Sequence, residues 1–440
     1  MYPLDPPAVY AHESVMANPT YRARVERVVA ALEKTRDIVT YRDDDLPDLI
    51  LHQGLMDGRK RMGRLDAVRD PILLFNTFRF DSPEAVAARR ERLVAQGVPC
   101  EQCRDSLVGT GAFHWARYNL DGDPCRHDKV CRPCWRIHLE DGCVHRCKYC
   151  DFGGLLVSMV NIEEYCEYLG HIIERHPWQK TYLLDDDGDP PGLEPELGVA
   201  SRLIEYFGTL EDRYLVVHTK TWNTRWLRSL KHNGNTIMLW SISGATQSRF
   251  LEPKAGSTEE RVEAARIAQE AGCPVRFKFK PIIPVRNWRE EAAEAVRLVF
   301  ERTTPDVISL CVFMWMTVDD MKSMLPVKLL DPEFLAEAES SVEEVKETRT
   351  KPFPPRVRAA IYDHYLNEIR KYDADIPVSL STETFAMWKA FQDKLGMSAT
   401  NYVCGCGPQS VPGARKLDAH AFNVAVRNDA GAIPGVVDGI

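Results

Sequence analysis

Short apolar segments alternate with amphipathic segments along the middle of the chain. Strands are predicted where apolar residues run together, at residues 181–184, 214–219, 236–241, 275–279 and 307–312. Helices are predicted between them, at residues 163–175, 196–208, 225–232, 258–271 and 288–302. This alternation is typical of an α/β fold with a parallel sheet covered by helices, either an open wound sheet or a partial barrel. In such folds the chemistry lies at the carboxyl ends of the strands.

The flanking segments have other patterns. Residues 1–95 predict a mixed cap with helices at 21–34 and 82–96 and a short strand at 71–75. Residues 96–140 are irregular and rich in cysteine, and the pattern after residue 330 is mainly helical, most clearly at 356–372. We therefore expect four regions: an N-terminal cap (1–95), a cysteine-rich metal-binding segment (96–140), the main domain (141–330) and a helical C-terminal extension (331–440).

Composition narrows the class of protein. The 440 residues carry a net charge of −8 and are 44% hydrophobic, which is ordinary for a globular protein. No apolar run approaches the roughly 20 residues that span a bilayer, and the N-terminus lacks a signal-peptide layout, so we expect a cytoplasmic protein without membrane contact. Because the chain is acidic, nucleic acid is a weak candidate partner, although a local basic groove stays open.

The most specific motif is the cysteine triplet Cys143, Cys147 and Cys150. Its C-x3-C-x2-C spacing supplies three thiolates for a [4Fe–4S] cluster and leaves the fourth iron open to a small molecule. The alternative is a structural zinc site, completed by His145. Zinc sites usually show two paired ligand blocks, and a tight triplet lacks the second pair, so the spacing favours the cluster.

The remaining cysteines predict a second metal site. The chain has 13 cysteines, and in a reducing compartment metal binding or catalysis explains them better than disulfides. Paired C-x2-C blocks indicate a zinc ribbon or an auxiliary [4Fe–4S] cluster held by Cys100, Cys103, Cys131 and Cys134. The alternates for one of these ligands, or for an external hydrogen donor, are Cys125, Cys404 and Cys406.

Two charged segments are candidates for substrate chemistry. The acidic loop 185–189 follows a predicted strand and suits a substrate that carries ammonium and hydroxyl groups, with Asp187 as the candidate base. A solvated acidic turn is the alternative. In the strand after residue 274, cations alternate with phenylalanines, so Lys278 and Lys280 are expected to point inward and to assist a leaving group. An ion-pair network is the alternative there.

Together the triplet and the alternating strands resemble the radical S-adenosylmethionine (radical SAM) superfamily. The resemblance implies a partial (β/α)6 TIM-like barrel, a [4Fe–4S] cluster and S-adenosylmethionine. More narrowly, residues 137–300 resemble the spore photoproduct lyase branch, through motifs such as Trp240-Ser241-Ile242-Ser243 and Glu252-Pro253. By this resemblance Lys220 and Ser241 contact the carboxylate of S-adenosylmethionine, and Tyr149 and Asp185 lie beside the cofactors. The chain differs from that branch after the triplet, where it has Asp151-Phe152-Gly153-Gly154, and it lacks the branch's cysteine donor.

The size and cysteine layout also resemble the radical SAM diol dehydratases of aminoglycoside biosynthesis. We therefore expect a radical SAM lyase that abstracts hydrogen from an amine-bearing sugar and removes a hydroxyl, as in antibiotic biosynthesis. An electron donor such as flavodoxin or a reductase is the expected protein partner. One alternative is repair of a DNA photoproduct, as in spore photoproduct lyase. The other is a zinc-dependent binding protein without radical chemistry.

Overall fold

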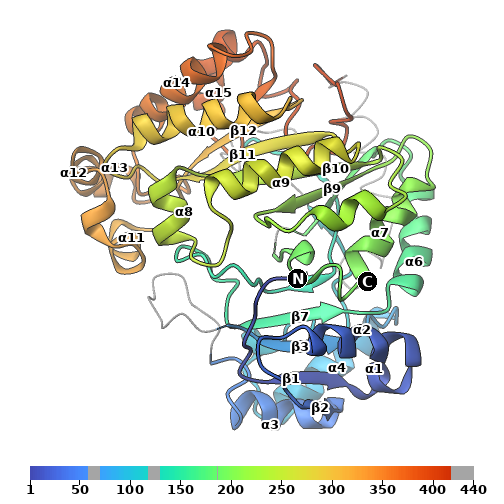
Figure 1. The fold of residues 1–440 in the computed structure, drawn as a ribbon. Helices are drawn as coiled ribbons and strands as arrows, with labels where there is room; N and C mark the ends of the chain where they lie inside the picture. Colours follow the sequence, from blue (N-terminus) through green and yellow to red (C-terminus); the bar gives the residue numbers. More distant parts are fainter. Residues whose placement is uncertain (58–69, 117–128, 186, 418–440) are drawn as a thin grey trace.

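Two sheets organise the chain in the computed structural model, which describes residues 1–57, 70–116, 129–185 and 187–417 (Figure 1). The smaller sheet has five strands in the order β2-β1-β3-β7-β6. They are β1 (Val9–His12), β2 (Ile38–Tyr41), β3 (Ile72–Asn76), β6 (Glu140–Asp141) and β7 (Leu155–Met159). All its pairs are parallel except β6 with β7. The N-terminal helices pack beside it: α1 (Glu13–Ala17), α2 (Pro19–Ala30), α3 (Leu46–Leu51) and α4 (Pro83–Ala95).

The larger sheet has eight strands in the order β13-β12-β11-β10-β9-β8-β5-β4. They are β4 (Phe113–Ala116), β5 (Cys134–Ile137), β8 (Thr181–Leu184), β9 (Tyr214–Thr219), β10 (Thr236–Ile242), β11 (Val275–Ile282), β12 (Ile308–Val312) and β13 (Val378–Leu380). Only β4 runs antiparallel to its neighbour. The predicted α/β class with parallel sheets is confirmed, while closure into a partial barrel stays a prediction.

Helices link successive strands of the larger sheet. These are α6 (Ile162–Arg175), α7 (Val199–Gly208), α8 (Ala245–Leu251), α9 (Thr258–Glu270) and α10 (Trp288–Arg302). The C-terminal helices are α11 (Val318–Met324), α12 (Pro332–Ser340), α13 (Val342–Val345), α14 (Pro355–Arg370) and α15 (Phe385–Leu395). The helix expected at 225–232 is wrong. Only a 3-10 turn forms at Arg225–Ser229, because Leu230 returns to extended backbone.

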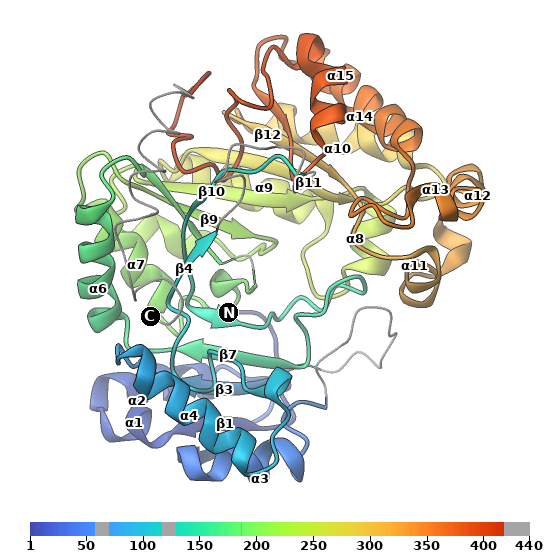
Figure 2. The same cartoon turned by 180° about the vertical axis from the view of Figure 1, so that it is seen from behind.

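The four expected regions are interwoven in the structure. The boundary expected at residue 140 falls inside β6, and β7 joins the N-terminal strands through its pairing with β3. The cysteine-rich segment contributes β4 and β5 to the larger sheet, and the C-terminal extension contributes β13. Figure 2 shows the smaller sheet below the larger one, with α14 and α15 on the far side of the larger sheet. Residues 418–440 of the expected extension lie outside the described residues.

The two faces of the larger sheet differ as the alternation predicts. Phe279 packs toward α14, where its ring lies 5.0 Å from that of Tyr365. We call this the outer face. The opposite, inner face carries Leu239, Ser241 and Lys278, and the last two are direct partners in the β10–β11 register. The functional site lies at the carboxyl end of this inner face.

Across the described ranges, no helix is both long and apolar enough to cross a membrane.

Candidate active site

The loop between β6 and β7 carries the cysteine triplet. It begins at Gly142, whose φ is +114°, and a Cβ there would lie 2.0 Å from the Leu155 carbonyl oxygen. Only glycine therefore fits this close approach to β7. The Gly142 N–H donates to the Asp187 carbonyl (3.0 Å), and the Lys148 N–H donates to that of Leu251 (2.8 Å). These backbone bonds fix the loop against the segments that follow β8 and β10.

His145 is held inside this loop by both ring nitrogens. Nε2 lies 2.6 Å from an Asp189 carboxylate oxygen, and Nδ1 lies 3.3 Å from the Lys254 carbonyl. The edge of the ring meets Tyr2, with 5.0 Å between ring centroids. Since both nitrogens are engaged, His145 positions the loop in this arrangement and does not act as a fourth metal ligand.

One small cavity gathers most of the predicted cofactor residues. It has a volume of about 120 Å³ and is lined by six of them, together with the candidate base Asp187: Cys143, Cys147, Tyr149, Cys150, Lys220 and Ser241. Its other members are His145, Gly188 and Asp189, which the sequence placed in the cysteine and acidic loops, and Phe152, His218 and Thr219, to which sequence reasoning gave no role. Residues from four separate segments thus meet at the ends of β8, β9 and β10. We call this cavity the cysteine pocket.

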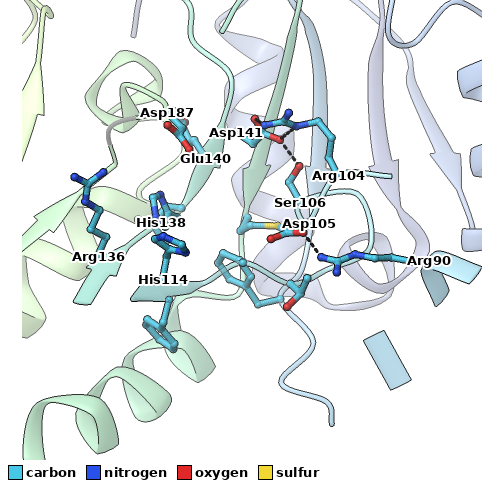
Figure 3. A pocket seen from close by; sticks show the side chains of 16 residues that line it. Arg90, Arg104, Asp105, Ser106, His114, Arg136, His138, Glu140, Asp141 and Asp187 are labelled. Carbon is cyan, nitrogen blue, oxygen red and sulfur yellow. Dashed lines mark hydrogen bonds and ion pairs between the residues drawn. The ribbon is translucent and has the colours of Figure 1, made fainter. Parts of the chain in front are cut away.

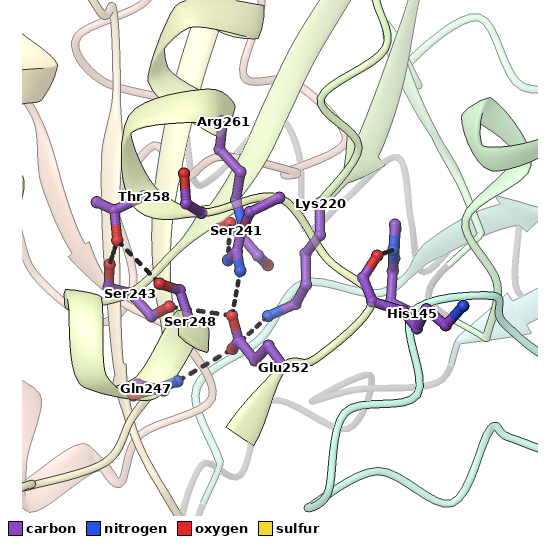
Figure 4. Close-up of polar contacts among 12 residues, drawn as sticks. His145, Lys220, Ser241, Ser243, Gln247, Ser248, Glu252, Thr258 and Arg261 are labelled. Carbon is purple, nitrogen blue, oxygen red and sulfur yellow. Dashed lines mark hydrogen bonds and ion pairs between the residues drawn. The ribbon is translucent and has the colours of Figure 1, made fainter. Parts of the chain in front are cut away.

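Lys220 belongs to a buried ionic network centred on Glu252 (Figure 4). Its Nζ lies 2.8 Å from Glu252 Oε1 and 2.9 Å from the Tyr149 hydroxyl. Arg261, Ser243 and Gln247 also donate to the Glu252 carboxylate. Burial alone would raise the pKa of Glu252, but the charges of Arg261 and Lys220 hold it well below its ordinary value. The network therefore holds the Lys220 ammonium at the rim of the cysteine pocket.

Ser241 is partnered by a histidine that sequence reasoning missed. Its Oγ lies 2.7 Å from His218 Nε2, and both residues line the cysteine pocket. His218 on β9 faces Leu239 in the β9–β10 register, so the two strands place the imidazole beside the hydroxyl. Ser241 thus has a fixed orientation at the pocket wall.

Two aspartates of the acidic loop after β8 are buried and hold neighbouring segments in place through hydrogen bonds. Asp185 is buried and accepts from the Leu139 and Glu140 N–H groups at 3.0 and 3.3 Å. Asp189 is also buried and accepts from the Thr219 hydroxyl (2.6 Å) and the Lys220 N–H (2.7 Å). Asp187 is only partly buried and lines the cysteine pocket. Asp185 does not line that pocket, so the expectation of direct cofactor contact is wrong for it.

A larger cavity of about 560 Å³ adjoins the cysteine pocket through Asp187 (Figure 3). It lies between the two sheets, and its charged and polar walls include Arg90, Arg104, Asp105, Ser106, His114, Arg136, His138, Glu140 and Asp141. Arg104 Nε binds Asp141 at 2.6 Å, and Arg90 pairs with Asp105. Burial and the neighbouring charge of Asp185 raise the pKa of Glu140 well above its ordinary value, which favours its neutral form in this wall.

The two lysines predicted to assist a leaving group lie away from both cavities. Lys278 Nζ lies 3.4 Å from Cys406 Sγ, and Lys280 Nζ lies 5.1 Å from the centre of the Trp315 ring. Neither residue lines the cysteine pocket or the larger cavity. The inward direction of Lys278 agrees with the alternation, but its neighbour is a thiol from the C-terminal segment.

The second metal site stays a prediction, because the described residues form no single-ion site for it. Within residues 1–57, 70–116, 129–185 and 187–417, no three His, Cys, Asp or Glu side chains converge on a point where one metal ion would bind. Cys100 and Cys103 share a 3-10 turn, whereas Cys131 lies in the electrostatic surroundings of Cys404. Cys125 lies outside the described residues.

The donor set of the cysteine pocket fits a [4Fe–4S] cluster. In a cubane each thiolate binds a different iron, so three thiols around one cavity are the expected arrangement, and convergence on a single point is not required. Burial raises the pKa of all three thiols, to about 12 for Cys150. A positively charged iron centre would reverse this shift, because metal binding deprotonates coordinating thiols.

Comparison with known proteins gives one consistent family. The family model described as "Spore photoproduct lyase" matches residues 131–315. Spore photoproduct lyase of Clostridium acetobutylicum is 26% identical over 178 residues, which are 38% of this chain and 53% of that protein. The enzyme of Bacillus subtilis (strain 168) is 28% identical over 163 residues, 36% of this chain and 48% of that one. The match spans about half the length of these curated relatives.

Solved structures extend the likeness of fold beyond the matched region. A cysteine-to-serine mutant of spore photoproduct lyase aligns with a TM-score of 0.56 and 14% identity, over 86% of this chain and 98% of that one. A double mutant "with bound AdoMet and dinucleoside spore photoproduct" aligns with a TM-score of 0.54 and 14% identity, over 87% and 100%. Residues 131–315 therefore resemble spore photoproduct lyase in sequence, and the likeness of fold extends over 86–87% of the chain.

Proposed function

We propose that this chain is a radical SAM lyase of the spore photoproduct lyase type. The observation that carries the proposal is the cysteine pocket, where three thiols from one loop meet Lys220 and Ser241 at the strand ends. When bound there, a reduced [4Fe–4S] cluster supplies the electron that cleaves S-adenosylmethionine to methionine and a 5′-deoxyadenosyl radical. An electron donor such as flavodoxin or a reductase would serve the same loop.

The chain's own residues have separable tasks in this proposal. Cys143, Cys147 and Cys150 hold the cluster, and Asp189 with His145 keeps their loop in place. Lys220 and the Ser241 hydroxyl offset the desolvation of the cofactor's carboxylate. Burial of the Glu252 network excludes water from this end of the pocket.

The larger cavity is the proposed substrate site. Its volume falls within the roughly 300–1,000 Å³ of ligand pockets, and Asp187 joins it to the cysteine pocket. The names of the relatives favour a thymine photoproduct of DNA as the substrate. The arginines of the wall, Arg90, Arg104 and Arg136, are suited to phosphate oxygens. Photoproduct repair therefore replaces the preference for an aminosugar drawn from the sequence, which no relative supports.

One observation keeps the aminosugar diol as a second candidate. Glu140, Asp141 and Asp187 line the same cavity, and carboxylates recognise ammonium and hydroxyl groups. In that reaction the neutral Glu140 would protonate the departing hydroxyl and Asp187 would act as base. Lys278 and Lys280 have no part in it, because they lie outside the cavity.

The test is anaerobic turnover of the reconstituted protein with S-adenosylmethionine and dithionite. We expect 5′-deoxyadenosine from the wild type and none from C147A, while C166A, on the distant helix α6, is the matched control. Dinucleoside spore photoproduct and an aminoglycoside with a vicinal diol are then compared as substrates. Repair to two thymines supports the lyase, and loss of water from the sugar supports the second candidate. Absence of 5′-deoxyadenosine in all samples would contradict both.

A further inference from the structure

The C-terminal turn Cys404–Gly407 inserts into the inner face of the larger sheet. The Gly405 N–H donates to Ser309 Oγ (3.1 Å), and the Gly405 carbonyl accepts from Arg276 (3.1 Å). The Pro408 carbonyl accepts from the N–H groups of Lys180 and Thr181 at 2.8 and 3.0 Å. Bonds to β8, β11 and β12 therefore fix the turn in one position.

This turn brings two thiols together. The Gly407 N–H lies 3.5 Å from the Cys404 carbonyl, so Cys404 and Cys406 belong to one tight turn. A Cβ on Gly405 would lie 3.0 Å from the Leu239 side chain, so the small residue between the cysteines permits the insertion. Both cysteines remain partly exposed, and both are free thiols.

Positive charge surrounds the second thiol. Lys278 Nζ lies 3.4 Å from Cys406 Sγ, and the charges of Arg136 and Lys280 also act on it. The Lys278 ammonium beside the sulfur therefore favours the thiolate form of Cys406. By contrast, burial raises the pKa of Cys273 to about 12. Cationic surroundings with partial exposure are typical of reactive cysteines, and buried apolar ones are inert.

The pair also lies close to the cysteine pocket. Cys406 packs against Leu239 and its apolar neighbours, and Leu239 is two residues before Ser241 on the same face of β10. Two residues along a strand span about 6.6–6.8 Å, so the thiols lie roughly one side-chain layer from the pocket wall. Neither thiol takes part in the function proposed above.

We propose that Cys404 and Cys406 form a redox-active dithiol beneath the cysteine pocket, with Cys406 as the attacking thiolate and Lys278 as its counter-ion. The Cys406 sulfur attacks a low-molecular-weight disulfide and releases one thiolate. The Cys404 thiol then loses its proton, attacks the Cys406 sulfur and releases the second thiolate. Two electrons thus pass from the pair to the reagent, and the Cys404–Cys406 bond replaces the reagent's S–S bond. The inference does not depend on radical chemistry.

The test equilibrates the full-length C143A/C147A/C150A protein anaerobically with glutathione and its disulfide at set ratios. Free thiols are then alkylated and counted by intact mass, and peptides are mapped. We expect two thiols to be lost in a single transition, with a disulfide linking Cys404 to Cys406. C404S should instead hold one glutathione on Cys406. C273S, which removes an inert thiol, should behave as the C143A/C147A/C150A protein does without it.

A further variant tests the role of Lys278 as the counter-ion. Because the ammonium stabilises the reduced thiolate form, K278Q should favour the disulfide, raising its formation constant about three- to tenfold, which is about 15–30 mV. An unchanged constant would overturn the role of Lys278. The proposed dithiol would be overturned if Cys404 and Cys406 both stayed reduced, and were therefore alkylated, in pure glutathione disulfide. A disulfide between either of them and Cys131 would overturn it as well. If the triplet variant shows the two-thiol transition while the protein with an intact triplet forms no 5′-deoxyadenosine, only the proposed radical function is contradicted.

Discussion

Glu252 is a fully buried carboxylate that pairs with Lys220 and Arg261. We predict that E252Q lowers the free energy of unfolding by about 3–5 kcal/mol, because removing one partner leaves buried cations uncompensated. The matched control is E263Q, which breaks an exposed pair with Arg266 and should cost less than about 1 kcal/mol. Urea denaturation measures both. Equal effects of the two variants would show that the network does not stabilise the fold.

Glu194 gives a pH dependence with a defined sign. Burial raises the pKa of the Glu194 carboxyl to about 7, from an ordinary value of 4.5. Between these values the folded chain keeps a proton that the unfolded chain releases, so this residue's contribution to stability falls as pH rises from 4.5 to 7. We predict that E194Q flattens the loss of stability across this window. E259Q, at an exposed position, should leave the dependence of the unfolding free energy on pH as in the wild type. Chemical denaturation at several pH values compares the three proteins.

At the residue scale, the sequence predicts which loops form the site but not which carboxylate of a loop lines the cavity. The cysteine spacing identified the three thiols of the pocket, and the resemblance to the spore photoproduct lyase branch identified Lys220 and Ser241. Asp185, Asp187 and Asp189 look alike in the sequence, yet only Asp187 reaches the larger cavity. Asp185 turns inward because its backbone has a positive φ of 43°, which no local pattern predicts. Similarly, His218 is recognisable only once β9 is paired with β10.

At the scale of elements, the loop after β6 depends on the backbone of Gly142. We predict that G142A costs at least about 2 kcal/mol of stability and sharply lowers bound iron, because the new methyl group would overlap the Leu155 carbonyl. G396A is the matched control: φ there is +65° and no atom lies within 4 Å of the added Cβ. It should cost only about 1 kcal/mol and leave iron binding intact. Normal iron content in G142A would contradict this account of the loop.

Elements with local signals were predictable, and those defined by distant pairing were not. The helix at 288–302 and the strand at 181–184 have the bounds that their patterns predict. The 225–232 segment has apolar spacing like a helix, but it is too short to pack as one and ends as a 3-10 turn. Strands β4 and β5 lie in an irregular, cysteine-rich sequence. Their place in the sheet follows from the pairing of β5 with β8 and of β4 with β5, not from their own periodicity.

At the scale of the whole molecule, the N-terminal residues cover the cysteine loop. The Tyr2 hydroxyl accepts from the Trp222 N–H (3.1 Å), and its ring meets His145. We predict that Y2A costs about 3 kcal/mol and speeds loss of the cluster's visible absorption in air, because the loop loses its cover. Y2F should retain the cover. Y372A removes an exposed tyrosine and should bleach at the wild-type rate. Equal bleaching of Y2A and wild type would contradict a protective role.

The overall arrangement combines segments that no local pattern links. The parallel α/β class followed from the alternation of strands and helices. The joining of β7 to the N-terminal strands and of β13 to β12 did not, because both pairings connect residues far apart in the chain. The larger cavity forms between the two sheets, so its chemistry could not be predicted from either region alone.

The central claim is that three thiolates hold a four-iron cluster and leave one iron open. Mössbauer spectroscopy of the ⁵⁷Fe-reconstituted protein, titrated with S-adenosylmethionine, tests it most directly. We predict that one iron in four changes its isomer shift as the cofactor binds and that C147A shows no such component. A spectrum that stays unchanged on titration, or a protein that binds zinc in place of iron, would contradict the account.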